Sequence, residues 1–239
     1  MGCDILCNRY MTSIAANLQA VRARIAAACV AAGREAESVQ LLAVSKTWPA
    51  SSVREAAAVG QRAFGENYVQ EACNKAAELA DPGLEWHFIG PLQSNKTRQI
   101  AENFAWVHSV DRLKIAERLA TQRPQELPAL QVCIQVNVSA EASKSGCTPD
   151  DLAALAHAVA ALPRLRLRGL MAIPEPSDDS RLQRSRFALL RQLRERLNSE
   201  GLVLDTLSMG MSHDLEAAIM EGATLVRVGT AIFGERNSA

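Results

Sequence analysis

Residues 41–66 read LLAVSKTWPASSVREAAAVGQRAFGE, and the architecture follows from the pattern inside them. An apolar run at 40–46 is followed by a stretch with helical spacing at 50–59, and Gly60 then separates that stretch from a second apolar run at 63–66. A strand, a helix and another strand in this order are typical of parallel strands joined by right-handed crossovers, because the helix returns the chain to its starting edge. The stretch therefore predicts one strand–helix–strand unit.

The same alternation recurs along the whole chain. After an amphipathic helix at 12–32 we expect eight strands, at 40–46, 63–66, 85–90, 105–110, 130–138, 165–172, 205–210 and 225–229. Helical stretches lie between the strands, at 50–59, 67–80, 93–103, 111–123, 149–161, 181–199 and 213–221. Eight such units predict an α/β protein with a single (β/α)8 TIM barrel preceded by an N-terminal helix. A doubly wound open sheet is the second choice, but no G-x-G-x-x-G follows the first strand and the chain has no P-loop.

Length and composition fit one globular unit. Of the 239 residues, 48% are hydrophobic and 22% are charged, which supplies enough apolar material for a large core. No linker rich in Pro, Gly or Ser divides the chain, so we assign residues 12–239 to one barrel domain. Residues 1–11 form an N-terminal extension that is a candidate for disorder, and both Met1 and Met11 are candidate start residues.

Charge and cysteine content argue against several functional classes. The formal net charge is zero, so the chain lacks the electrostatic footprint of a nucleic-acid-binding or membrane-surface protein. The arginine-rich segment 181–196 is interpreted as a solvated helix face. The six cysteines contain no C-x-x-C pair, so we predict neither a metal site nor a disulfide framework, and reduced thiols favour the cytoplasm. No apolar run approaches the roughly 18 residues that a membrane span requires.

Lys46 stands at the end of the first apolar run. Side chains alternate along a strand, so Leu42, Val44 and Lys46 share the interior face, and Lys46 lies at the C-terminal rim where barrel active sites are built. Desolvation among apolar walls lowers the pKa of an amine and favours its nucleophilic form. Lys46 is thus placed to form a Schiff base, as in pyridoxal phosphate sites and some aldolases. The alternative is a lysine that extends from the rim into water.

A second constellation lies in SMGMSHDLEAAIMEGATLVRVGTAIFG, residues 208–234. It contains two glycine-bearing strand ends, one of which leads into a helix that is expected to begin about Ser212. Backbone N–H groups at such turns and at a helix N-terminus bind anions, and a phosphate fits there. Thr230 and Ser212 add hydroxyls, while Gly210 and Gly229 let a phosphate approach the backbone. Each glycine alone reads as an ordinary turn, but strands seven and eight flank strand one in a closed barrel, so the cradle would lie beside the rim lysine.

Five ordered strings carry a resemblance to a known family. AVSKTWP, FGENYVQE, WHFIGPLQSNK, SMGMSHD and VRVGTAIFGER resemble the pyridoxal phosphate homeostasis protein family over roughly residues 12–236. The fold of that family is similar to the N-terminal barrel domain of bacterial alanine racemase. The resemblance implies pyridoxal 5'-phosphate as the cofactor.

The resemblance also implies roles for individual residues. Lys46 would carry the cofactor as a Schiff base, Arg227 would face the pyridine nitrogen, and Asn67 would lie near the cofactor. The residues implied to hold the phosphate are Ser212, Gly229 and Thr230.

Four positions leave alternatives or doubts. Arg227 can instead form a salt bridge to a carboxylate such as Glu66, and Asn67 is equally suited to cap the helix that follows it. Trp48 departs from the family, because many relatives carry a second lysine there. Lys144, in the string SAEASKSG, is at most a secondary lysine that does not bind covalently.

Four aromatic or imidazole side chains lie near the predicted strand ends. His87 is interpreted as a hydrogen-bonded core histidine, and Trp86 and Trp106 are expected to pack between barrel and helices. His213 falls near the cofactor and is given no role.

The favoured function is cofactor handling. Arg227 stays protonated and would oppose protonation of the pyridine nitrogen, which weakens the ring as an electron sink. We assign no catalytic residue and expect a cytoplasmic protein that buffers or delivers pyridoxal 5'-phosphate and so affects amino-acid and keto-acid balance indirectly. Its partners would be the cofactor and apo-enzymes that depend on it, with the protein itself a monomer or weak dimer.

Two enzymatic readings compete. The first is a slow pyridoxal-phosphate-dependent amino-acid racemase that uses Lys46 as one base. Alanine racemase takes its second base from a tyrosine of an added β domain, and we expect no such domain after the eighth strand. The second is a cofactor-free Schiff-base aldolase with a sugar phosphate in the cradle.

Overall fold

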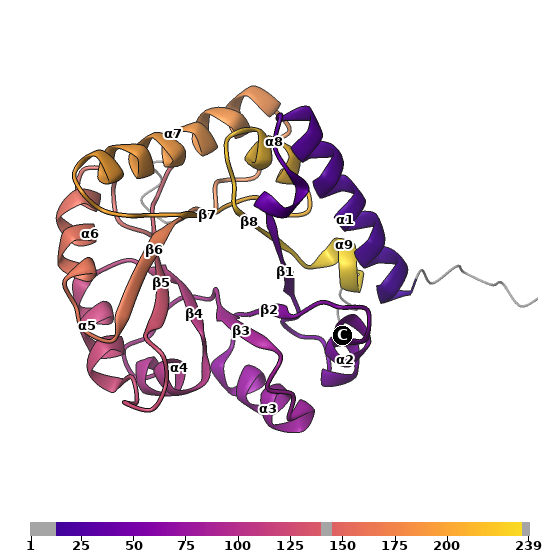
Figure 1. Cartoon of the computed structure of the whole chain (residues 1–239), viewed down its shortest axis with the longest axis horizontal. Helices are drawn as coiled ribbons and strands as arrows, with labels where there is room; N and C mark the ends of the chain where they lie inside the picture. Colours follow the sequence, from indigo (N-terminus) through magenta and orange to yellow (C-terminus); the bar gives the residue numbers. More distant parts are fainter. Residues whose placement is uncertain (1–12, 140–144, 236–239) are drawn as a thin grey trace, which may run out of the picture.

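The computed structural model describes residues 13–139 and 145–235. In this part of the chain, eight parallel strands close into a barrel in sequential order, and the last strand pairs with the first (Figure 1). The strands are β1 (Gln40–Val44), β2 (Ala63–Glu66), β3 (Glu85–Phe88), β4 (Trp106–Val110), β5 (Leu130–Gln135), β6 (Leu165–Met171), β7 (Thr206–Ser208) and β8 (Leu225–Val228). All eight fall within their predicted ranges, so the (β/α)8 prediction is confirmed. The predicted N-terminal extension lies outside the described residues.

Helices surround the barrel. They are α1 (Ile14–Ala31), α2 (Ala50–Ala58), α3 (Val69–Leu79), α4 (Thr97–Asn103), α5 (Leu113–Gln122), α6 (Leu152–Ala160), α7 (Ser180–Ser199), α8 (Leu215–Met220) and α9 (Thr230–Phe233), with a short 3-10 helix η1 (Ala36–Ser38). The helix expected from about Ser212 begins later, at Leu215, because Asp214 Oδ1 accepts the Met211 N–H at 2.6 Å and holds the intervening residues in a turn. Helix α9 was not predicted.

The N-terminal helix α1 is capped and packed onto the barrel. The Ser13 side chain accepts the Ala16 N–H, and the buried face of α1 includes Leu18 and Ile25. Asn17 Nδ2 donates to the Ile232 carbonyl at 2.8 Å, which ties α1 to α9. Among the described residues, α1 is the one helix long and apolar enough to cross a membrane by length and composition, a property that the core helices of soluble proteins share. Its buried face belongs to the main core.

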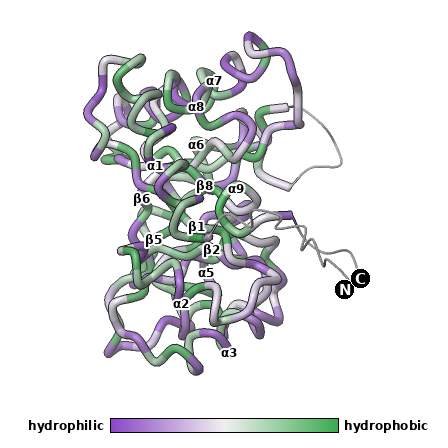
Figure 2. Tube along the Cα trace, turned by 90° about the vertical axis from the view of Figure 1, so that its right-hand side faces the viewer, coloured by the Kyte–Doolittle hydropathy of each residue, from purple (hydrophilic) through white to green (hydrophobic). Residues whose placement is uncertain are grey.

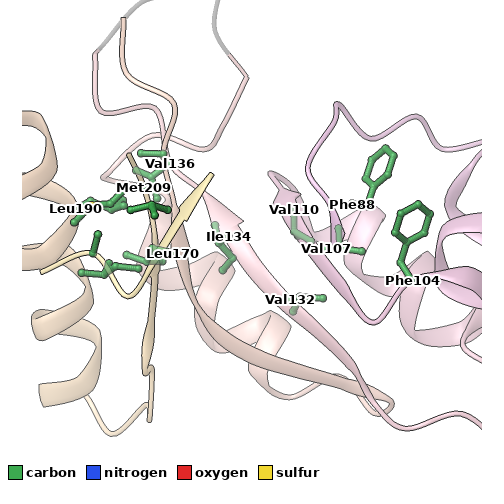
Figure 3. Close-up of a cluster of buried hydrophobic side chains, with 14 of the residues drawn as sticks. Phe88, Phe104, Val107, Val110, Val132, Ile134, Val136, Leu170, Leu190 and Met209 are labelled. Carbon is green, nitrogen blue, oxygen red and sulfur yellow. The ribbon is translucent and has the colours of Figure 1, made fainter. Parts of the chain in front are cut away.

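The main core lies between the strands and the helices. Outward-facing residues such as Ala43 and Val228 belong to it, together with buried faces of the helices. Figure 3 shows part of this layer, with Phe88 and Phe104 packed against each other at a ring separation of 5.3 Å. In Figure 2 the strands run through the middle of the molecule as largely hydrophobic segments, while purple polar segments are frequent in the helices around them. The apolar layer between sheet and helices therefore encloses the barrel.

The barrel interior is different, because its apolar groups are few. Leu42, Ala63 and Leu225 form one small cluster, and a second cluster is made by Trp106, Cys133 and Met171. The expected alternation of β1 is confirmed, since Leu42 lies inside and Ala43 outside.

Trp86 and Trp106 lie in different layers of the fold. Trp86 packs on Phe64 at 5.9 Å within the main core, as expected. The prediction for Trp106 is wrong, because this ring is stacked on His87 at 5.4 Å and belongs to an interior cluster. Its partner in the β3–β4 register is His87, so the two side chains project to the same face. His87 is fully buried and hydrogen-bonded, as predicted.

Candidate functional site

A cavity of about 220 Å³ lies among the C-terminal ends of the strands. All six residues singled out in the sequence contribute to its lining: Lys46, Asn67, Ser212, Arg227, Gly229 and Thr230. Its apolar walls come from Val44, Trp48, Ile89, Ile173 and Met211, and His213 and Gly234 complete it. This volume is many times the space that a single water molecule needs, so a small organic molecule can enter.

Lys46 is half-buried at the rim and stands on a tightly held piece of backbone. Before it, the Ser45 carbonyl accepts Lys75 Nζ at 2.7 Å; after it, the Thr47 N–H donates to Glu71 Oε1 at 2.5 Å. Thr47 has φ 68°, a left-handed conformation that a β-branched residue adopts only when its surroundings impose it. These contacts fix where the Lys46 side chain leaves the strand end.

A buried cluster of charged side chains holds the backbone beside Lys46 in place. Glu66 Oε1 accepts Lys75 Nζ at 2.7 Å and the Ser45 hydroxyl at 2.6 Å, and Lys75 Nζ also contacts Glu71. Burial raises the pKa of Glu66, and the nearby Lys75 ammonium opposes that shift. Arg227 donates instead to Ser208 and to the Ala172 carbonyl, so the alternative salt bridge between Glu66 and Arg227 is wrong. The role of Lys75 was missed in the sequence, where it looks like an ordinary helix residue.

Arg227 is 3% exposed and is held by oxygen acceptors from two other strand ends. Its Nη1 donates to the Ser208 carbonyl at 2.6 Å and to Ser208 Oγ at 2.8 Å, and its Nη2 donates to the Ala172 carbonyl at 2.8 Å. Burial lowers the pKa of Arg227 to about 10, with Asp214 opposing the shift. Arg227 therefore stays a cation at neutral pH and presents its charge to the cavity.

Asn67 follows β2 and contributes a side chain with an unused acceptor. Helix α3 begins at Val69 with Tyr68 at its N-cap position, so the alternative role of Asn67 as a cap is wrong. Its Oδ1 is buried and has no hydrogen-bond partner within the described part of the chain. A buried amide oxygen without a partner is costly, so a donor on a bound molecule would satisfy it.

The three residues predicted to hold a phosphate lie in two turns that line the cavity. Ser212 lies in the turn between β7 and α8, and Gly229 and Thr230 lie where β8 passes into α9. The first N–H groups of a helix have no intrahelical acceptor and so remain able to bind an anion. Gly210 has φ +92°, and a Cβ there would lie 2.6 Å from the Ala218 Cβ, so this glycine allows the turn to pack on α8. Strand β8 pairs directly with β1, as predicted. The prediction that strand seven also flanks strand one is wrong, because β7 pairs with β8 and β2 takes the other side of β1.

Trp48 occupies the side of the cavity near α9. Its ring lies 6.1 Å from that of Phe233 in a stacked arrangement. An aromatic side chain therefore occupies the position at which many relatives carry a second lysine, and it adds no amine to the cavity. Lys144 lies outside the described residues. Within those residues, no group of three or more His, Cys, Asp or Glu side chains is placed to hold a metal ion.

Comparison with known proteins identifies relatives of the chain. Residues 13–237 match the family described as alanine racemase, N-terminal domain. The pyridoxal phosphate homeostasis protein of Pseudomonas aeruginosa is 67% identical over 227 residues, covering 95% of this chain and 97% of that protein. The protein of the same name from Escherichia coli is 56% identical over 233 residues, covering 95% and 98%. The structure of PipY from Synechococcus elongatus with PLP bound is 41% identical, with a TM-score of 0.82 and coverage of 93% and 100%.

Proposed function

The chain belongs to the pyridoxal phosphate homeostasis protein family, and on this basis we propose that it binds pyridoxal 5'-phosphate reversibly in the rim cavity and buffers or delivers it in the cytoplasm. The observation that carries this proposal is the joint lining of one cavity by a lysine, an arginine and an anion cradle. An amine, a cation and a ring of N–H donors match an aldehyde, a pyridine nitrogen and a phosphate respectively. Apo-enzymes that use the cofactor are the proposed recipients.

Six of the lining residues have a part in holding the cofactor. Lys46 supplies the amine for a Schiff base, and Ser212, Gly229 and Thr230 bind the phosphate. Arg227 faces the pyridine nitrogen, and the unpartnered Oδ1 of Asn67 accepts a donor of the cofactor. When bound, pyridoxal 5'-phosphate supplies a reactive aldehyde carbon conjugated to an electron-withdrawing ring.

Arg227 favours storage over catalysis. Its pKa of about 10 keeps the guanidinium charged, so it can donate to a pyridine nitrogen but cannot hold that nitrogen protonated. A carboxylate at this position would do the opposite and strengthen the ring as an electron sink. The proposal therefore assigns no catalytic residue and treats the lysine linkage as a reversible attachment.

Absorbance of the purified protein tests the attachment. With added pyridoxal 5'-phosphate we expect a visible band, and borohydride should fix a pyridoxyl group on the peptide that contains Lys46. Lys46→Ala should lose the band, while the matched control Lys114→Ala, on the exposed start of α5, should keep it. A band that persists in Lys46→Ala, or a colourless wild-type protein that traps a keto substrate, would contradict the proposal.

The family description keeps the racemase alternative open to a direct test. Incubation with an amino acid in deuterated water should give no exchange at Cα at enzyme-like rates. Rapid exchange that is lost in Lys46→Ala would establish a racemase instead.

A further inference from the structure

A series of hydrogen-bonded polar side chains, here called the relay, crosses the barrel interior from the rim cavity toward the N-terminal ends of the strands. Starting from Arg227, its members are Ser208, His108, His87 and Glu85. The successive contacts are Arg227 Nη1 to Ser208 Oγ at 2.8 Å, Ser208 Oγ to His108 Nδ1 at 2.8 Å, His108 Nε2 to His87 Nδ1 at 2.9 Å, and His87 Nε2 to Glu85 Oε1 at 2.8 Å. The three central side chains are fully buried.

The end of the relay at Glu85 reaches solvent. The side chain of Glu85 is 42% exposed. Nearby, at the N-terminal mouth, a cavity of about 170 Å³ is lined by Gln40, Trp106 and Arg168 among others. The barrel thus has a buried hydrogen-bond connection between its two mouths.

Chemistry at the two ends sets the direction of every bond. Arginine only donates, so Ser208 Oγ accepts from Arg227, and a carboxylate only accepts, so His87 must carry its proton on Nε2. A neutral His87 then accepts at Nδ1, which requires His108 to carry its proton on Nε2. His108 Nδ1 is left as an acceptor, and the Ser208 hydroxyl must donate to it. The hydrogen bonds of the relay are therefore consistent with one tautomer of each histidine, the one that is protonated on Nε2.

We propose that Ser208, His108, His87 and Glu85 form a one-way hydrogen-bond relay that positions Arg227 for the cofactor and whose direction is set by the Glu85 carboxylate. The part that concerns the cofactor rests on the proposed function, whereas the direction of the relay does not. Ser208 and the histidines are positioning residues, because they act on the cavity through Arg227.

The surroundings of the relay keep both histidines neutral. Desolvation lowers the pKa of His87, against the raising effect of Glu85. The pKa of His108 is well below its ordinary value chiefly because of burial, and the charge of Arg227 lowers it further. Trp106 stacks on His87, and the Arg168 guanidinium lies 4.9 Å over that indole while paired with Asp205. The charged groups that face the imidazoles are therefore Glu85 from β3 and Arg227 from β8, with the Arg168–Asp205 pair behind Trp106.

Without the Glu85 carboxylate, the donor and acceptor roles along the relay could reverse. If nothing at position 85 can accept, His87 is free to move its proton to Nδ1, His108 then protonates on Nδ1, and Ser208 becomes an acceptor from both sides. The Ser208 hydroxyl proton must then turn away from His108, and Ser208 Oγ has to accept from Arg227 Nη1 and His108 Nδ1 at the same time. Arg227 thus competes with His108 for an acceptor that it does not share in the wild-type arrangement. The polarity at the rim is thus determined by a side chain at the opposite mouth.

Histidine NMR on the protein without cofactor tests the direction. The chain has four histidines, and long-range proton–nitrogen spectra distinguish Nδ1–H from Nε2–H. His157→Gln and His213→Gln, which alter residues outside the relay, assign the other two rings. At pH 7 we expect both His87 and His108 as neutral Nε2–H tautomers. An Nδ1–H on either ring would overturn the proposal.

Variants of Glu85 test what sets the direction. Glu85→Gln keeps an oxygen acceptor and should preserve both tautomers, whereas Glu85→Leu should give a mixture with Nδ1–H in both rings. Unchanged Nε2–H tautomers in Glu85→Leu would overturn the role of the carboxylate. His157→Gln is the control, since His157 is an exposed residue of α6 paired with Glu200.

Cofactor titration tests the consequence for Arg227. Ser208→Ala should weaken pyridoxal 5'-phosphate binding about tenfold, as for the loss of one hydrogen bond to a charged group, with Glu85→Leu weaker than wild type and Glu85→Gln unchanged. Equal affinity in all three variants would overturn the positioning role. If the wild-type protein bound no cofactor, the proposed function would fail, while the tautomer result would still decide the direction of the relay.

Discussion

The layer between sheet and helices and the interior of the barrel are built on opposite principles. The outer layer is a continuous apolar cluster, whereas the interior holds two small apolar clusters and a file of buried polar side chains. Interiors of such barrels are usually filled by branched apolar residues. The difference teaches that here the outer layer carries the stability of the fold, while the interior is given over to hydrogen bonds that lead to the cavity.

The largest effect should come from opening the outer layer. Phe104 is 2% exposed and packs edge to face on Phe88, so Phe104→Ala should lower the free energy of unfolding by about 3–5 kcal/mol. Urea denaturation measures the change. Val203→Ala, at a side chain that is 88% exposed, is the control and should change stability by less than about 0.5 kcal/mol. A loss below about 1 kcal/mol in Phe104→Ala would show that the outer layer is not the main source of stability.

A slightly smaller effect is expected at the buried charges beside the cavity. Lys75→Met removes the partner of Glu66, which is fully buried, and should destabilise the fold by about 3 kcal/mol. The double variant Lys75→Met/Glu66→Leu should recover much of that loss, because no charge is then left unpaired. Denaturation of the two variants side by side gives the answer. A double variant no more stable than the single one would mean that the lysine acts by packing rather than by charge.

The smallest effect is a pH dependence that belongs to the interior. His87 and His108 have pKa values below their ordinary 6.5, so the unfolded chain binds protons that the folded protein excludes. Their contribution to stability is complete above about pH 6.5 and is lost as the pH falls toward the folded pKa values, at up to about 1.4 kcal/mol per pH unit for each ring.

Denaturation at a series of pH values between about 5 and 7.5 measures this slope. His108→Gln should reduce it, whereas His157→Gln, at an exposed site, should have little influence on the part due to the relay. If the unfolding free energy of His108→Gln depended on pH as steeply as that of the wild type, the acid sensitivity would not arise in the barrel interior.

Much of the site was predictable because period-two alternation places side chains reliably. Leu42 and Lys46 follow from one strand and Arg227 from another, and closure of an eight-stranded barrel brings those strands together. The alternatives at Asn67 and at the Glu66–Arg227 pair failed for a different reason. Both depended on which of several nearby partners a polar group chooses, and that choice depends on distances between separate strands.

The order of the eight strands, the inward faces of β1 and β8 and the residue types at the strand ends were determined by the sequence alone, because they follow from local periodicity and from the geometry of a closed sheet. Only the tertiary structure decided that Lys75 clamps the backbone beside Lys46, that Trp106 turns inward, and that His87 and His108 meet between the two mouths. The physical reason is that a hydrogen bond depends on tenths of an ångström between atoms from different strands, and a linear pattern does not carry that information.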